Sequence, residues 1–153
     1  MSRYAENTQV SSDRSRAEIE RTLSRYGATS FMYGWQESHA LVAFEVRERR
    51  IRFLLPMPDR ADFRFTPSRR TLRSTQQRDA EYERAIRQRW RALALVIKAK
   101  LEAVEAGVAE FEEEFLAHIM LPDGTTVGQS AIPAIAHAYQ TGKMQPLLPH
   151  FGD

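Results

Sequence analysis

Arginine and phenylalanine side chains are interleaved in the middle of the chain, and this pattern has the clearest chemical meaning in the sequence. Four arginines belong to or border a predicted hairpin: Arg47, Arg49, Arg50 and Arg52. The next segment mixes further arginines with two aromatic rings: Arg60, Phe63, Arg64, Phe65, Arg69, Arg70 and Arg73. Guanidinium groups bind phosphates and aromatic rings stack on bases, so this composition predicts binding to single-stranded nucleic acid. The alternative is that both rings hold the segment to the core while the arginines are merely solvated.

A second row of cations follows on a predicted helix. Arg84, Arg87, Arg91 and Lys98 are separated by three, four and seven residues, which places them along one stripe of a helix. Such a stripe can follow a phosphate backbone without reading bases. It can equally meet the acidic residues Glu110 and Glu112 to Glu114, in the same chain or in a neighbour. The sequence does not separate these two roles.

The net charge of +2 hides an uneven distribution. Residues 47–100 contain fourteen arginines and two lysines against six acidic residues, which gives +10. Residues 101–153 contain one lysine against eight acidic residues, which gives −7, and residues 1–46 sum to −1. This asymmetry favours a polyanionic partner such as DNA, or self-association of basic and acidic faces into a homo-oligomer.

Residues with catalytic or metal-binding potential are scattered. The chain has no cysteine, and its four histidines lie far apart in sequence, at His39, His118, His137 and His150. No phosphate-binding loop, Gly-rich dinucleotide turn, nucleophile elbow or H-E-x-x-H motif is present. Glu114 and His118 are four residues apart on a predicted helix and offer two metal ligands, but no third is identifiable. We therefore expect no catalytic residue, no metal and no cofactor, and an enzyme is the minority interpretation.

Hydropathy argues against a membrane protein. The longest apolar run, residues 92–97, is far shorter than the roughly 20 residues that span a bilayer. The first thirty residues lack the apolar stretch of a signal peptide. We therefore expect a cytoplasmic protein.

The apolar periodicity predicts a single α+β domain over residues 1–153, with a core at 12–106 and an acidic C-terminal appendix at 108–153. Residues 1–11 and the connection 57–77 have no clear period, and we expect the basic connection to be mobile. The expected elements are a helix over 12–26, strands over 31–36, 40–46 and 51–55, a long helix over 77–106, a helix over 109–118, a hairpin pairing 119–121 with 125–127, and a helix over 129–140. Together they form a three-stranded antiparallel sheet packed by the N-terminal and long central helices, followed by a helix-hairpin-helix appendix.

The alternating aromatic residues Phe31, Tyr33 and Trp35 of the first predicted strand allow two interpretations. They can form a stacking platform for nucleic acid. The favoured interpretation is a core row beneath the long helix, with Trp90 packed on it. Pro133 is expected to fit only in the first turn of the last helix.

Three stretches carry a resemblance that covers nearly the whole chain. They are Ser2 to Thr8 (SRYAENT), Arg87 to Leu93 (RQRWRAL) continuing to Ala106, and Phe115 to Ile119 (FLAHI) with Leu121 to Gly124 (LPDG). The chain resembles a family of small, largely uncharacterised proteins of phages and prophages. The resemblance implies a phage or integrated-element setting and a cytoplasmic site of action, and it carries no activity or functional residue.

The predicted order of elements is also similar to the core of single-strand-annealing recombination proteins of the RecT/Redβ type. Those proteins form rings or filaments with DNA in a basic groove. Double-stranded-RNA-binding domains share the order, but their basic signature at the helix start is missing here. We therefore expect a non-catalytic, oligomeric factor that binds or anneals single-stranded DNA through an arginine-rich groove. The alternative is a phage inhibitor or adaptor that engages a host protein.

Overall fold

Three antiparallel strands form a sheet in the order β1-β2-β3, and their alternating apolar residues explain the pairing. The strands are β1 (Ser30–Trp35), β2 (His39–Val46) and β3 (Arg49–Pro56). Phe31 pairs with Phe44 and Phe44 pairs with Ile51, so alternate residues of all three strands face the same side. The computed structural model describes residues 3–36, 38–68 and 71–149.

A two-residue turn connects β2 and β3. Arg47 and Glu48 have positive φ angles of 51° and 62°. Two successive positive φ angles are typical of a tight hairpin turn whose twist matches that of the flanking strands. The strands predicted over residues 40–46 and 51–55 leave a longer connection at 47–50, but Arg49 and Arg50 already pair with β2.

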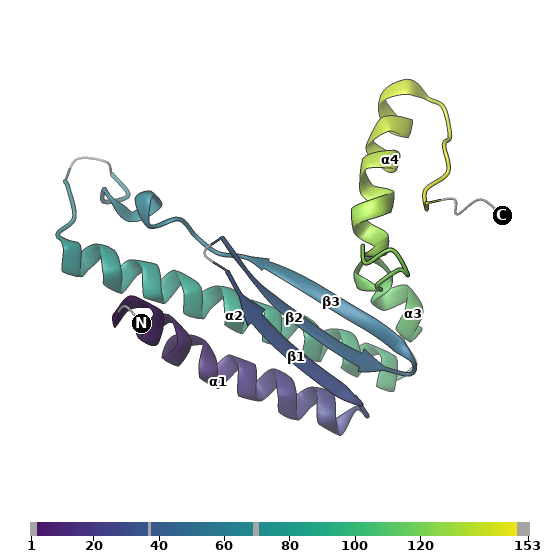
Figure 1. The fold of residues 1–153 in the computed structure, drawn as a ribbon, viewed down its shortest axis with the longest axis horizontal. Helices are drawn as coiled ribbons and strands as arrows, with labels where there is room; N and C mark the ends of the chain where they lie inside the picture. Colours follow the sequence, from purple (N-terminus) through teal and green to yellow (C-terminus); the bar gives the residue numbers. More distant parts are fainter. Residues whose placement is uncertain (1–2, 37, 69–70, 150–153) are drawn as a thin grey trace.

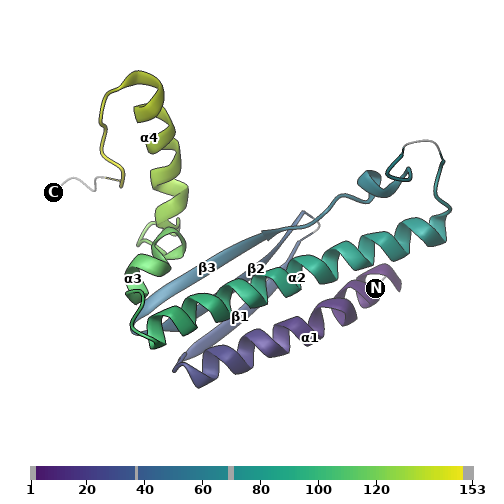
Figure 2. The ribbon, with the colours of Figure 1, turned by 180° about the vertical axis from the view of Figure 1, so that it is seen from behind.

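Two long helices, α1 (Arg3–Arg25) and α2 (Thr75–Glu105), lie side by side on one face of the sheet (Figure 1, and Figure 2 from behind). Their apolar stripes and the inner face of the sheet form one core. Trp90 of α2 is buried at its centre, and its ring centroid lies 5.2 Å from that of Tyr33. Phe31 and Tyr33 are partly buried against this core, as predicted, whereas Trp35 at the end of β1 is exposed. The predicted α+β architecture is confirmed.

The N-terminal helix begins nine residues earlier than the sequence indicates. Residues 1–11 are predicted to be loose, but α1 is helical from Arg3. The prediction depends on apolar periodicity, and the sequence of residues 3–11 has no regular apolar row. In the part of α1 whose side chains are described, Ile19 and Leu23 are fully buried. Once a helix is nucleated, each further turn costs little, so a polar stretch can extend it without a buried face.

The connection between β3 and α2 contains local structure that periodicity does not predict. A short 3₁₀ helix, η1 (Arg60–Phe63), is capped by Asp59, whose carboxylate accepts from the backbone N–H of Ala61 at 3.0 Å. Farther along, Phe65 and Leu72 form an antiparallel bridge. The long helix then begins at Thr75, where Ser74 and Gln77 form a reciprocal capping box.

The C-terminal segment folds around the free edge of β3. It contains α3 (Phe111–Glu114), the 3₁₀ turn η2 (Leu116–His118) and α4 (Val127–Thr141). Ile119 bridges Ile51 of β3, and the N–H of Met120 donates to the carbonyl of Arg50 at 2.8 Å. Helix α4 then extends away from the sheet and from α2 (Figure 1 and Figure 2).

Three predictions for this segment are wrong in detail. The helix expected over residues 109–118 is interrupted at Phe115, because that ring is buried against Phe44 and Phe53 of the sheet. The expected hairpin is reduced to a single bridge between Met120 and Thr126. Pro133 lies inside α4 and not in its first turn.

Candidate nucleic-acid interface

The four hairpin arginines contact neighbouring residues of their own chain. The guanidinium of Arg49 lies 2.8 Å from the Glu112 carboxylate of α3, and that of Arg50 lies 3.7 Å from Glu45. Arg52 donates to the side-chain carbonyl of Gln129 in α4 at 2.8 Å, and Arg47 lies over the Phe111 ring. Three of these four contacts tie the hairpin to the C-terminal segment. These cations therefore have a structural role that accounts for their presence without any external partner.

The hairpin arginines and the connection lie at opposite ends of β3. The strand has eight residues, which corresponds to a length of about 26 Å. The structure therefore does not bring the two arginine groups into one groove. It brings the connection together with the N-terminal half of α2, and we call the surface formed by residues 60–68 and 71–91 the basic surface. Arg69 and Arg70, which the sequence analysis also selects, lie outside the described residues.

The two phenylalanines of the connection have different environments. Phe63 is partly buried, and its ring meets the Tyr82 ring of α2 edge-on with centroids 6.0 Å apart. Phe65 leaves 48% of its surface exposed. The sequence analysis left two roles open for these rings, stacking on bases and anchoring the connection, and each role fits one of them. Phe63 holds the connection to the core, and Phe65 is available for stacking.

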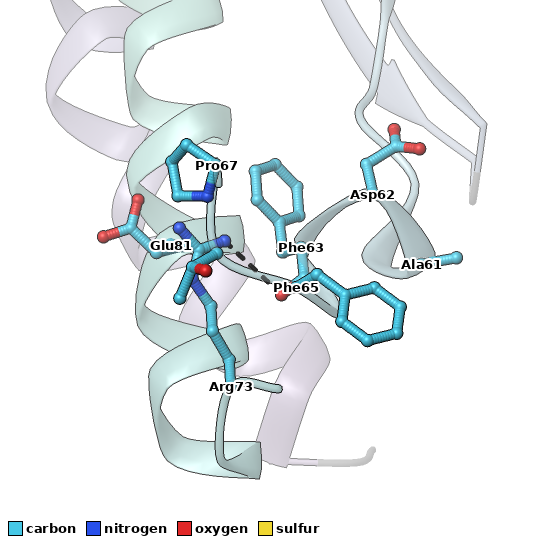
Figure 3. A pocket seen from close by; sticks show the side chains of 8 residues that line it. Ala61, Asp62, Phe63, Phe65, Pro67, Arg73 and Glu81 are labelled. Carbon is cyan, nitrogen blue, oxygen red and sulfur yellow. Dashed lines mark hydrogen bonds between the residues drawn. The ribbon is translucent and has the colours of Figure 1, made fainter. Parts of the chain in front are cut away.

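An open hollow of about 630 Å³ lies between the connection and α2 (Figure 3). Phe63 and Phe65 line it together with Arg73, and Figure 3 shows the Phe65 ring on the side away from α2. Arg73 is held in place because its guanidinium donates to the carbonyl of Phe63 at 3.4 Å. Asp62 and Glu81 add two carboxylates to the wall. A stacking ring beside hydrogen-bond donors and acceptors is a suitable environment for a nucleobase.

A second, smaller hollow of about 280 Å³ adjoins the first and shares Ala61 with it. Three arginines line it: Arg60, Arg64 and Arg78. Arg60 lies 3.3 Å from the Asp79 carboxylate, and Arg78 donates from Nη2 to the hydroxyl of Thr75 at 3.2 Å. Within the described part of the chain, the buried Nε of Arg78 has no hydrogen-bond partner. Clustered guanidinium groups are suited to binding a phosphate.

Arg78 is a site residue that the sequence analysis misses. The stripe of three arginines on α2 begins at Arg84, so Arg78 does not extend it. The available signal was its position only four residues after the helix cap at Ser74, where a side chain can reach back to the connection.

The predicted stripe on α2 is exposed. Arg84 lies 4.0 Å from Glu81, and within the described ranges Arg87 and Arg91 have no ion pair or hydrogen bond through their side chains. Residues 59–91 contain ten arginines and no lysine against five acidic residues, so this stretch carries +5. The basic surface thus combines free cations on α2 with the two hollows of the connection.

Glu114 and His118, the pair considered as metal ligands, both contact other side chains of the chain. Lys100 of α2 donates from Nζ to the Glu114 carboxylate at 3.0 Å, and the His118 ring stacks on Phe53 with centroids 4.0 Å apart. Burial, and then the positive charge of Lys100, lower the pKa of His118 below its ordinary 6.5. No group of three potential metal ligands occurs among the residues that the structure describes.

Comparison with protein families, with curated proteins and with solved structures gave no match for this chain. Over the described residues, no helix has both the length and the apolar character needed to cross a bilayer.

Proposed function

We propose that the chain binds single-stranded DNA through the basic surface. In this function, Arg84, Arg87 and Arg91 of α2 neutralise phosphates along the strand, and the arginine-lined hollow holds one phosphate. A base unstacked from the strand enters the larger hollow and stacks on Phe65. Stacking requires a base face that a duplex does not offer, which favours single strands over duplex DNA.

The observation that carries this proposal is the pair of adjoining hollows, one aromatic and one lined by three arginines. The base and the phosphate of one nucleotide are close together, so a site that binds both needs an aromatic hollow next to a cationic one. The proposal needs no chemical step: the protein binds, and the DNA is unchanged. A cytoplasmic role in phage recombination or replication remains a prediction from resemblance.

The test is binding of labelled single-stranded and duplex DNA across a salt series. The variant Arg84→Glu/Arg87→Glu removes two exposed cations from the basic surface. We expect weaker single-strand binding and a salt slope reduced by about 1.4, because each phosphate contact on a single strand contributes about 0.7.

The matched control is Arg14→Glu/Arg21→Glu, which makes the same change in net charge at exposed positions of α1. We expect it to leave the salt slope close to that of the wild type. Absence of binding at low salt contradicts the proposal, and so does an equal loss in both variants.

The second candidate is a protein-binding adaptor for a host or phage protein. It is favoured by the exposed apolar side chains of α4, which DNA does not require. Binding to a purified partner that survives nuclease treatment and the Arg84→Glu/Arg87→Glu substitutions distinguishes it from a nucleic-acid bridge.

A further inference from the structure

Helix α4 exposes an apolar stripe to solvent. The side chains of Ile132, Ile135 and Tyr139 are 63%, 41% and 89% exposed, and their spacing of three and four residues places them on one side of the helix. From Gly124 to Gly142 the sequence has no Asp, Glu, Lys or Arg. An apolar helix without a charged face is normally covered by other protein.

The structure attaches α4 to the rest of the chain through its first turns. Gly128 and Ala131 are its buried residues, and Gly128 lies directly against the backbone of Ala117. The remaining turns extend away from the body (Figure 1). A helix of 15 residues is about 22 Å long, and an isolated helix of this length is only marginally stable in water. Covering the stripe on α4 would therefore stabilise the helix as well as remove apolar surface from water.

A second uncovered apolar stripe lies on α2, on a side that contacts neither the sheet nor α1. Ala92, Leu95, Val96 and Ala99 are all exposed, and Leu95 has 57% of its surface accessible. Their spacing of three, four and seven residues matches the spacing of the α4 stripe. The small alanines allow another helix to approach closely. Helix α4 of the same chain extends away from α2 (Figure 2).

The charges beside the two stripes are complementary. Lys98 lies beside the stripe on α2 and is exposed. Glu110 and Glu113 are exposed in the same C-terminal segment as α4. This local pattern agrees with the charges of −7 on residues 101–153 and +10 on residues 47–100. Charge complementarity therefore favours an approach of the C-terminal segment of one copy to α2 of another.

We propose that α4 of one copy packs on the α2 stripe of a second copy, so that the chains associate head to tail. The two contacting surfaces differ, which makes the interface heterologous, and successive copies form a ring or a filament. This inference goes beyond DNA binding and does not depend on it. It specifies which surfaces join the copies.

The test is the mass in solution, measured by light scattering over a range of protein concentrations. We expect the wild type to have a multi-subunit mass that falls on dilution. Ile135→Arg on α4 and Leu95→Arg on α2 each remove one of the two surfaces, and each variant alone is expected to be a monomer. Both side chains are exposed, so the variants should fold, which circular dichroism checks. Gln140→Arg, which adds the same charge to an exposed position off the stripe of α4, should keep the wild-type mass.

Mixing the two single variants gives the sharpest outcome. The Leu95→Arg chain keeps an intact α4 and the Ile135→Arg chain keeps an intact α2 stripe, so one pair of surfaces remains. We expect the mixture to form a complex of two subunits that grows no further. A wild-type monomer overturns the proposal. So does a mixture that stays monomeric. A Leu95→Arg variant that dimerises on its own also overturns it, because its intact α4 helices would then pair symmetrically.

Discussion

Phe63 and Phe65 are two residues apart in the same arginine-rich segment, and only their surroundings distinguish them. Phe63 reaches the Tyr82 ring because η1 turns it toward α2. Phe65 follows after the helical turn has ended, and it bridges Leu72 with its ring exposed. The sequence predicts that aromatic rings belong to this site. It does not predict which ring is the anchor, because that depends on a 3₁₀ turn with no apolar periodicity.

Replacing the exposed ring tests its proposed contact with a base. Stacking contributes about 1–3 kcal/mol per base, so we expect Phe65→Ala to weaken single-strand binding by roughly one order of magnitude. Phe65→Trp should retain binding. Leu72→Ala, at a more exposed apolar position of the same bridge, is the control and should have little effect. Fluorescence titration with a normal and an abasic oligonucleotide measures the difference. If Phe65→Ala binds both as the wild type does, the ring does not stack on a base.

His118 makes stability dependent on pH. Burial and the charge of Lys100 lower its pKa in the folded chain below 6.5, while a hydrogen bond with the backbone of Arg52 acts in the opposite direction. As the pH falls through 6.5, the unfolded chain takes up a proton at this residue before the folded chain does. The contribution of His118 to stability is therefore complete above about pH 6.5 and decreases as the pH falls below that value.

Urea unfolding at pH 7.5 and pH 5.5 measures this contribution. We expect the free energy of unfolding of the wild type to be lower at pH 5.5. The variant His118→Phe keeps a ring to stack on Phe53 and does not titrate, so its decrease should be smaller. Equal decreases in the two proteins would assign the pH dependence to other groups.

At the scale of elements, the sequence predicts those helices and strands that have a regular row of apolar residues. The three strands and the long helix each bury a regular row of residues, and all four are found within a few residues of their predicted positions. The sequence of the first turns of α1 has no regular apolar row. At Phe115, burial of one ring in the sheet core interrupts the expected helix. The basic surface is predicted in part, because the clustering of arginines is local, whereas the partnership of Arg78 with the connection arises only in the folded chain.

The junction between η2 and α4 depends on a glycine. A Cβ atom on Gly128 would lie 2.8 Å from the carbonyl oxygen of Ala117, which is a backbone atom that cannot move freely. We expect Gly128→Ala to weaken the attachment of α4 by about 1–3 kcal/mol, which outweighs the roughly 0.5–1 kcal/mol that alanine gains over glycine in a helix. Amide hydrogen exchange in α4 should therefore become faster.

Gly34→Ala in β1 is the matched control, because nothing lies within 4 Å of its added Cβ atom. We expect α4 to exchange at the wild-type rate in that variant. Unchanged exchange in Gly128→Ala would show that η2 can shift to accommodate a methyl group.

At the scale of the whole molecule, the arginines of the hairpin and those of the basic surface have different roles. The sequence analysis assigns both groups to one DNA-binding groove. The hairpin arginines contact Glu112, Gln129 and Phe111 and hold the C-terminal segment in place. The basic surface lies at the other end of the sheet, and some of its arginines make no ion pair or hydrogen bond within the described residues. Helix α4 therefore projects from the end opposite the proposed DNA site, which leaves both surfaces accessible at the same time.

Head-to-tail association should make DNA binding cooperative on long strands. A filament or ring repeats the basic surface once per copy, so copies bound to one strand raise the effective concentration of the next. The wild type should bind long single strands cooperatively, whereas Ile135→Arg should bind them more weakly and without cooperativity. On an oligonucleotide of about 8 nucleotides, within the range that one binding module covers, the two proteins should have equal affinity. Equal affinity on long strands as well would separate the two proposals, leaving the basic surface as a site used by single copies. A loss on the short strand would instead place α4 in the DNA site itself.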